Sequence, residues 1–293
     1  MPQPRLTADS MHHLPSPRPV RSRIEQLLEL PQQPGYVRPR QEWSARIEPF
    51  ESYGQNLKNL DAGYRRFETY YRANYLPHIP RDRGTRIAVL SCGPGYLVHA
   101  LVQAGYTNVQ GIDASPRYIE HAQQHDLPCK LGEPVAFLED LRGQLDFIIP
   151  EQELNHLTLE ETIDFLTLCR QTLADGPEAG VLVYAINGGN PLTSPEHLSH
   201  NIDHFYSVTE YSLEQILVLA GFTDVRPFPC ELYVFWKNPA NYVGWAVTHA
   251  FEFTVRVLLR FYGKRLRILS KRIAATARTR PPTPKPHPRP TNT

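Results

Sequence analysis

The stretch "IAVLSCGPGYLVHAL", from Ile87 to Leu101, decides the fold, because an apolar run breaks at Gly-Pro-Gly and then resumes with a helical period. The part before the break is short and apolar, as in a buried strand. Gly93 and Gly95 let the backbone turn sharply and approach a ligand without a Cβ in the way. The stretch therefore predicts a strand, a tight loop that faces a ligand, and a helix that ends at Gly105.

The chain on either side of this stretch alternates between strand and helix patterns. Apolar runs such as "VQGIDA", "LDFIIP" and "GVLVYAIN" are separated by helical segments, and Thr158 with Glu161 forms a capping box at the start of one of them. This alternation predicts an α/β fold with a doubly wound, mostly parallel sheet and right-handed crossovers. The runs "TDVRPF" and "ELYVFW" predict an antiparallel C-terminal strand pair.

An acidic residue at the end of the second strand suggests what the loop binds. Asp113 follows Gly95 by about 18 residues, where a carboxylate can accept hydrogen bonds from both ribose hydroxyls of a nucleoside. A dinucleotide site would have a third glycine where Val98 stands, and no Gly-Lys-Ser/Thr sequence follows the loop. The pattern favours a ligand with a ribose and no phosphate, while a plain structural turn is the alternative.

The sequence resembles the class I S-adenosylmethionine-dependent methyltransferases, and within them the bacterial branch associated with sugar and polysaccharide biosynthesis. The resemblance rests on "VLSCGPGYLVHAL", "GYTNVQGIDASPRYIEHA", "LDFIIPEQELNHL" and "HFYSVTEYSLEQILVLAGFTDV", of which the first two are the most specific. It implies a seven-stranded Rossmann-like sheet, with S-adenosylmethionine as the cofactor. The cofactor-binding residues that it implies are Ser91, Gly93, Gly95, Asp113, Glu133, Glu151 and Gln152.

Each of these residues has an expected partner on the cofactor. The two loop glycines would pack against the methionine part, Asp113 would bind the ribose, and Glu133 would face the adenine amine. Glu151 and Gln152 would border cofactor and acceptor, beneath a helix that carries Tyr71. The chain departs from the family pattern because Val89 replaces an acid, Ser91 replaces the first glycine, and amides replace two acids near Gln152. These departures favour a non-catalytic member of the fold as the alternative.

Methyl transfer needs alignment of the acceptor with the cofactor, and a hydroxyl acceptor is also helped by a base. The candidates for catalysis are His156 after the third clear strand and the pair Asp203 and His204 in "SHNIDHFYS". The alternative for each histidine is a structural role. We expect no metal site, because His121, His125 and His156 share no metal-ligand spacing. The four cysteines show none either, and they suggest a reducing compartment.

Composition and charge divide the 293 residues into four parts. Of the 28 prolines, eight precede residue 40 and six follow residue 280, so we expect residues 1–45 and 277–293 to be disordered tails. The methyltransferase-like domain, with its N-terminal helical cover, is expected at 46–238 and a basic amphipathic helix at 239–276. All 30 acidic residues lie at or before Glu252, and 11 of the 31 basic residues follow it. An acidic body of this kind argues against nucleic acid as a partner.

The expected helix has two interpretations. Its apolar residues could pack on the domain or on a second subunit in a homodimer, with the basic residues in solvent. Residues 250–275 could instead lie on an anionic membrane surface, where each basic residue contributes roughly 1 kcal/mol. The chain shows no apolar leader or membrane span, which predicts a cytoplasmic protein, either free or peripheral at the inner membrane.

The predicted function is the transfer of a methyl group from S-adenosylmethionine to an oxygen or nitrogen of a small molecule or glycan, which can be lipid-linked. The alternative is a scaffold or membrane-surface adaptor that keeps the methyltransferase fold and works through its basic helix. A nicotinamide-dependent dehydrogenase is the third possibility, and Val98 argues against it.

Overall fold

The structure is a computed structural model that describes residues 60–152, 154–200 and 204–280. The tail predicted at 1–45 lies outside the described residues, as do residues 281–293 of the other predicted tail. The strands are β1 (Ile87–Leu90), β2 (Val109–Asp113), β3 (Cys129–Leu131), β4 (Phe147–Pro150), β5 (Gly180–Ile186), β6 (Thr223–Cys230) and β7 (Arg272–Arg278). The helices are α3 (Asp61–Asn74), α4 (Tyr96–Gln103), α5 (Pro116–Gln124), α6 (Pro134–Asp140), α7 (Leu159–Thr172), α8 (Ser194–His200), α9 (Glu210–Leu219) and α10 (Pro239–Phe261), with short 3-10 turns η3 (Leu76–His78) and η4 (Leu154–His156).

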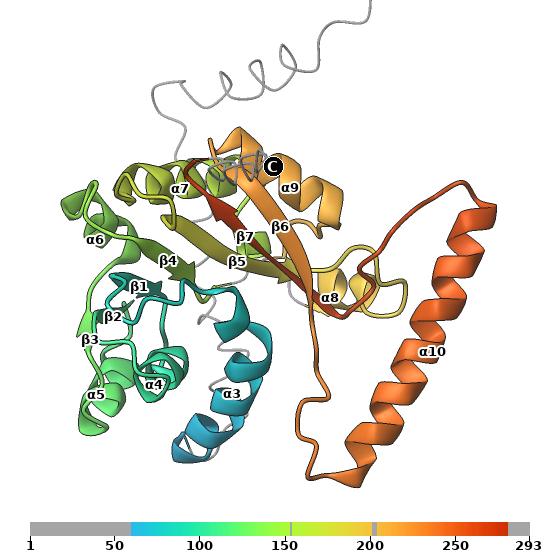
Figure 1. The fold of residues 1–293 in the computed structure, drawn as a ribbon, viewed down its shortest axis with the longest axis horizontal. Coiled ribbons are helices and arrows are strands. Elements are labelled where there is room, and N and C mark those ends of the chain that lie inside the picture. The colour runs from blue at the N-terminus through green and yellow to red at the C-terminus, as the bar shows by residue number, and fades with distance from the viewer. Residues whose placement is uncertain (1–59, 153, 201–203, 281–293) are drawn as a thin grey trace, which may run out of the picture. The chain divides into compact units, whose positions relative to one another are not determined.

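The strands form one sheet in the order β3-β2-β1-β4-β5-β7-β6 (Figure 1). The pairs among β1 to β5 are parallel, whereas β7 runs antiparallel to both β5 and β6. This confirms the predicted doubly wound α/β fold, with a seven-stranded, mostly parallel sheet and an antiparallel pair at the C-terminus. Because β1, β2, β4 and β5 are parallel, their carboxyl ends lie along one edge of the sheet, where ligands bind in this class of fold.

Apolar side chains cover the sheet on both faces. All four residues of β1 are buried, and they alternate between two clusters, with Val89 in one cluster and Leu90 in the other. Side chains of α3, α4 and α5 complete the first cluster, and side chains of α6, α7 and α9 complete the second. A parallel sheet with helices on both faces explains why its strands are continuously apolar in the sequence.

The prediction of one helix over 239–276 is wrong in its second half. Helix α10 ends at Phe261, where Gly263 adopts a left-handed φ of 70°. The amide of Gly263 donates to Arg260 O at 3.0 Å and the amide of Lys264 donates to Leu259 O at 2.9 Å, which is a Schellman motif. The glycine therefore ends the helix, although apolar residues continue at helical spacing after it.

The antiparallel pair also uses a different segment from the predicted one. Residues 231–236 form no strand, and β7 at 272–278 lies between β5 and β6 instead. Alanines 274, 275 and 277 of β7 are fully buried, because helices and neighbouring strands enclose this position. Strand β6 takes the edge of the sheet, which suits Pro227 and Pro229 because they have no amide to donate. The domain predicted at 46–238 is thus incomplete without residues 272–278, and the tail predicted from 277 begins inside β7.

The segment between β6 and β7 is an insertion at the carboxyl edge of the sheet. Strand β6 ends at Cys230, and β7 starts at Arg272, which pairs with Ile186, the last residue of β5. Helix α10 lies within this insertion (Figure 1). The insertion therefore places a long helix at the edge where a ligand of the sheet would bind.

Among the described helices none has the length and apolarity to cross a bilayer.

Candidate functional site

The loop from β1 to α4 contains three residues with left-handed backbone. Ser91 and Gly93 have φ of 52° and Gly95 has φ of 80°. A Cβ on Gly95 would lie 2.9 Å from Leu127 Cδ1, so this glycine permits close packing of the loop on its own domain. A Cβ on Gly93 would meet no atom within 4 Å, so Gly93 borders open space. The backbone at Gly93 is thus accessible to a ligand, whereas Gly95 packs against the domain.

Ser91 stands where the methyltransferase pattern has a glycine, and its backbone adopts the left-handed conformation that favours glycine. A non-glycine residue in this conformation costs roughly 1–2 kcal/mol. The Ser91 hydroxyl donates to Gln152 Oε1 at 3.2 Å, which links the loop after β1 to the segment after β4. Val89, where the pattern has an acid, is fully buried in β1 and belongs to the apolar cluster under α3 and α4. A charge at that position would have no polar surroundings.

Asp113 lies directly beside the loop, at the end of β2. Its Oδ2 accepts the amide of Gly93 at 2.8 Å and its Oδ1 accepts the amide of Ser115 at 2.8 Å. Asp113 therefore binds both the glycine loop and Ser115, the N-cap residue of α5. Each carboxylate oxygen has a further lone pair, so Asp113 can still accept hydrogen bonds from a diol.

Glu133 follows β3 at the same edge of the sheet. It is the N-cap residue of α6, and its side chain is exposed. Its side chain makes no capping hydrogen bond to the first turn of α6. The predicted cofactor residues thus follow four adjacent strands, in the spatial order β3, β2, β1 and β4.

Glu151, directly after β4, is the most perturbed acid of the site. Tyr71 of α3 donates a short hydrogen bond to its Oε2, and the Tyr184 hydroxyl of β5 donates to its backbone oxygen at 2.9 Å. The residue is partly exposed as a whole, but its Oε1 is buried and has no hydrogen-bond partner among the described residues. Burial raises the pKa of Glu151 to about 7, against the opposing effect of the Tyr71 hydrogen bond. A carboxyl with this pKa can take or give a proton near neutral pH.

Two further residues of this region, Tyr184 beside Glu151 and Arg272 beside Tyr184, were not predicted as site residues from the sequence. Tyr184 is the one residue with a hydroxyl in the apolar strand β5, and that isolated polar atom was the available signal. Arg272, the first residue of β7, lies with its guanidinium carbon 5.6 Å from the centre of the Tyr184 ring. Burial lowers the pKa of Arg272 to about 10. Nothing in the sequence pointed to Arg272, because its place depends on the unexpected position of β7.

The predicted catalytic histidines lie together. The rings of His156, at the end of η4, and His204 are 4.7 Å apart between centroids in an edge-to-face arrangement. His204 Nδ1 lies 2.5 Å from the carbonyl oxygen of His197 and donates to it, so Nε2 takes no part in that hydrogen bond. The amide of Phe205 donates to Asn155 O at 2.9 Å and joins the two segments. Asp203, the third candidate, lies outside the described residues.

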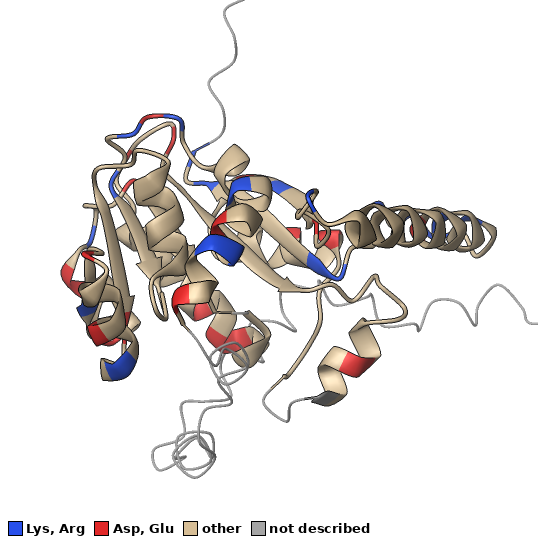
Figure 2. Ribbon diagram, turned by 90° about the horizontal axis from the view of Figure 1, so that it is seen from below, with Lys and Arg blue, Asp and Glu red and all other residues tan. Residues whose placement is uncertain are grey.

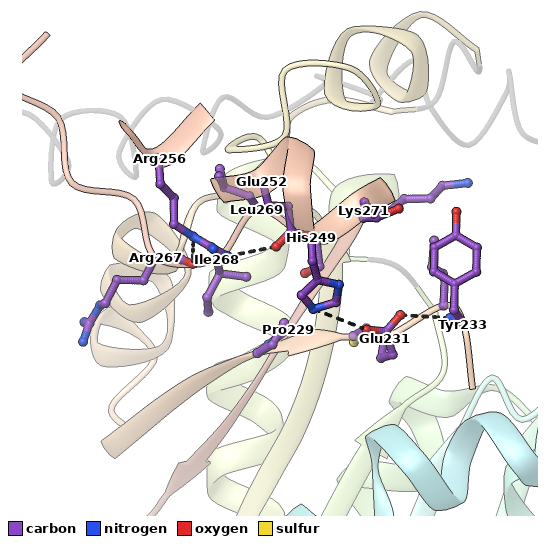
Figure 3. A pocket seen from close by; sticks show the side chains of 14 residues that line it. Pro229, Glu231, Tyr233, His249, Glu252, Arg256, Arg267, Ile268, Leu269 and Lys271 are labelled. Atoms are coloured by element: carbon purple, nitrogen blue, oxygen red, sulfur yellow. Dashed lines mark hydrogen bonds and ion pairs between the residues drawn. The ribbon is translucent and has the colours of Figure 1, made fainter. Parts of the chain in front are cut away.

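A pocket of about 150 Å³ lies under α10, beside the ends of β6 and β7 (Figure 3). Its walls carry an ion pair between Arg256 and Glu252 at 2.8 Å and a contact between His249 Nε2 and Glu231 Oε2 at 4.0 Å. Glu231 is also tied to α3, because its amide donates to Asn74 Oδ1 at 2.6 Å. None of the lining residues belongs to the glycine loop, so this pocket is separate from the predicted cofactor site.

The expectation that the histidines lack metal-ligand spacing needs correction for one pair. His121 of α5 and His125, the C-cap residue of α5, are four residues apart, and both approach Asp61 of α3. The spacing of four residues places both rings on one face of a helix. The spacing of histidines along the sequence does not reveal that an acid from a different helix lies beside two of them.

Comparison with known proteins finds similarity in structure alone. No protein-family model matches the sequence, and no curated protein matches it. A S-adenosylmethionine-dependent methyltransferase from Archaeoglobus fulgidus is 19% identical with a TM-score of 0.53, and the alignment covers 73% of this chain and 93% of that chain. The complex between the Haloferax volcanii Trm112 methyltransferase activator and a putative methyltransferase contains a chain that is 14% identical with a TM-score of 0.52, covering 81% of this chain and 99% of that one. The protein therefore has the fold that these solved structures share.

Proposed function

We propose that the protein is a S-adenosylmethionine-dependent methyltransferase that acts on an oxygen or nitrogen of a small-molecule or glycan acceptor. The observation that carries the proposal is the loop at the edge of the sheet, where Gly93 borders open space and Asp113 accepts the Gly93 amide at 2.8 Å. A nucleoside without a phosphate suits this site, because the loop offers a carboxylate beside uncrowded backbone. The shared fold supports the same ligand class.

The residues present fit this cofactor. Asp113 would accept hydrogen bonds from the ribose, Glu133 would face the adenine, and Gly93 with Gly95 would border the methionine part. Ser91 and Gln152, joined at 3.2 Å, would lie beside the reacting end together with Glu151. The buried Oε1 of Glu151 has no partner among the described residues, so it can accept a hydrogen bond from a ligand group. When bound, the cofactor supplies a methyl group on a sulfonium centre.

Side chains at the carboxyl edge of the sheet are the candidates for removing a proton from the acceptor. The pKa of Glu151 near 7 makes its carboxylate a suitable base at neutral pH, and Tyr71 holds the carboxylate in place. His156 and His204, 4.7 Å apart, form the second candidate pair, with Asp203 as their neighbour in sequence. We assign the acceptor side of the site to these histidines, because the Nε2 atom of His204 takes no part in the hydrogen bond to His197.

Calorimetric titration of the full chain with S-adenosylmethionine, S-adenosylhomocysteine and NAD tests the proposal. We expect micromolar binding of the first two and none of NAD. Asp113→Asn should weaken binding by at least about tenfold, because a ribose hydroxyl loses its charged acceptor. Asp140→Asn, at an exposed acid at the end of α6, is the matched control and should change nothing. Absence of binding by both sulfur compounds would overturn the proposal.

Helix α10 supports a more specific proposal about the location of the acceptor. Only Glu252 of this helix is buried, whereas Val243, Val247 and Phe261 are 65%, 63% and 83% exposed. At about 100° per residue these three lie on one side of the helix, and Glu252 lies about 180° from Val243. The helix therefore buries an acid and leaves an apolar stripe facing outward, although Phe251, Val255 and Leu259 lie on its inner side.

We infer that this apolar stripe rests on an anionic lipid surface and that the acceptor is lipid-linked. In Figure 2, α10 is tan over most of its length, and its sequence holds only three charged residues. Exposed basic residues follow directly, with Arg260, Lys264 and Arg265 near the end of the helix, and no acid follows Glu252 in the chain. An apolar stripe next to a cluster of positive charge is complementary to an anionic leaflet.

Co-sedimentation with vesicles of phosphatidylcholine, with and without phosphatidylglycerol, tests this inference. We expect binding to the anionic vesicles alone, and we expect Val247→Glu to abolish it. Val218→Glu, on an exposed valine of α9, is the matched control and should bind as the wild type does. A homodimer in solution that Val247→Glu dissociates, or no binding to either vesicle, would contradict the inference.

The second candidate function is a non-catalytic scaffold that keeps the fold and works through α10. The outward apolar stripe is the observation in its favour. Vesicle binding that depends on Val247, in a protein that binds neither S-adenosylmethionine nor S-adenosylhomocysteine, would establish it over the first.

A further inference from the structure

Two histidines and an aspartate from two helices meet on the face of the domain that α3 and α5 cover. His125 Nε2 lies 2.9 Å from Asp61 Oδ1, and His121 Nε2 lies 3.4 Å from the same oxygen. The three potential ligand atoms all lie within 4.8 Å of one another. From this convergence we propose that Asp61, His121 and His125 form a binding site for a divalent transition metal, with Zn²⁺ as the ion of choice.

The separations suit a tetrahedral ion. Ligand atoms at Zn–N and Zn–O distances of 2.0–2.1 Å are about 3.3 Å apart in a tetrahedral arrangement. The His121 separation of 3.4 Å already matches this value, and the His125 separation of 2.9 Å requires a small opening. Imidazole nitrogens with one carboxylate are a typical zinc donor set. Three protein ligands leave a position for water or another donor.

The surroundings keep the histidines ready to bind. Tyr64 of α3 packs against both rings, with centroid distances of 5.8 Å to His121 and 4.5 Å to His125. The spacing of four residues on α5 fixes the two rings relative to each other. The two imidazoles and the carboxylate are thus oriented before any ion arrives.

An ion at this place would join α3 to α5 and act on the glycine loop through Tyr64. The Tyr64 hydroxyl donates to Pro94 O, inside the loop, at 2.7 Å. The Tyr96 hydroxyl at the start of α4 donates to Leu60 O at 2.9 Å, immediately before Asp61. The metal would therefore hold in place the helix that covers the loop, and its role would be structural.

Zinc titration of the metal-free full chain, in competition with a chromogenic zinc chelator, tests the site. We expect the wild type to bind one zinc ion at this cluster, and we expect Asp61→Asn and His125→Gln to weaken that binding by at least about tenfold. His249→Gln is the matched control, because His249 also faces a carboxylate, Glu231 at 4.0 Å, but outside the cluster. It should bind zinc as the wild type does.

Thermal unfolding supplies a second readout that does not depend on methyl transfer. Zinc should raise the unfolding midpoint of the wild type and of His249→Gln, and it should leave that of Asp61→Asn unchanged, since an ion that binds only the folded state stabilises it. The three ligands are at least partly exposed, so the metal-free variants should keep the wild-type midpoint. Equal zinc affinity in the wild type and His125→Gln, or no binding by the wild type at micromolar zinc, would overturn the proposal and leave a hydrogen-bonded cluster.

Discussion

Replacing Glu151 with glutamine should stabilise the ligand-free protein, and the gain should grow as the pH rises. The pKa of Glu151 is about 7 in the folded protein, whereas its ordinary value is 4.5. Between these two values the folded state keeps a proton that the unfolded state has released. The free energy of unfolding therefore falls as the pH rises through this window, and the full loss is present above pH 7. Glutamine removes the titration and can still accept the hydrogen bond from Tyr71.

The size of the effect follows from the gap between the two pKa values. The gap between 4.5 and about 7 corresponds to roughly 3 kcal/mol at 1.36 kcal/mol for each pH unit. Roughly three quarters of this develops between about pH 5 and pH 8, because the unfolded carboxyl is already mostly ionised at the lower limit. A cost of this size at one carboxyl is typical of a group kept for its chemistry at the expense of stability.

Urea unfolding of the ligand-free full chain at several pH values measures the effect. The quantity of interest is the difference in free energy of unfolding between Glu151→Gln and the wild type, in which other titrating groups cancel. Glu133→Gln, which removes an exposed carboxyl from the same edge of the sheet, is the control. A difference for Glu151→Gln that stays constant from about pH 5 to pH 8 would refute the reasoning.

Four further substitutions test backbone strain, packing, ligand access and helix capping. Gly93→Ala should cost only about 1–2 kcal/mol in urea unfolding, yet abolish S-adenosylmethionine binding in calorimetry, because its Cβ would fill open space beside the loop. Gly95→Ala should cost about 2–5 kcal/mol, since its Cβ would also crowd Leu127 Cδ1 at 2.9 Å; equal costs for the two variants would contradict this. Gly263→Ala should reduce the helical circular dichroism signal at the end of α10 and cost about 1 kcal/mol, with no change if the Schellman motif is not formed. Thr158→Ala should destabilise the protein by about 1 kcal/mol in urea, and Thr158→Ser, which keeps the cap hydroxyl, should not.

The parts of the site that could be predicted lie next to a strand that is itself evident in the sequence. Gly93, Gly95 and Asp113 follow the apolar runs of β1 and β2 directly, and parallel pairing brings those ends together without further information. The proton-binding behaviour of Glu151 could not be predicted in this way. It depends on burial by α3 and on Tyr71, which is 80 residues away in the chain.

The sequence by itself determined the doubly wound sheet and the glycine loop, because these rest on local periodicity, turn residues and the parallel pairing that follows from them. Only the tertiary structure decided that β7 comes from residues 272–278, since Ala274, Ala275 and Ala277 suit a strand enclosed on all sides and the sequence shows no sign of that enclosure. It also decided that α10 turns its apolar side outward and that Asp61 meets His121 and His125. A helical period specifies which residues share a face, and the direction of that face depends on contacts with segments far away in the chain.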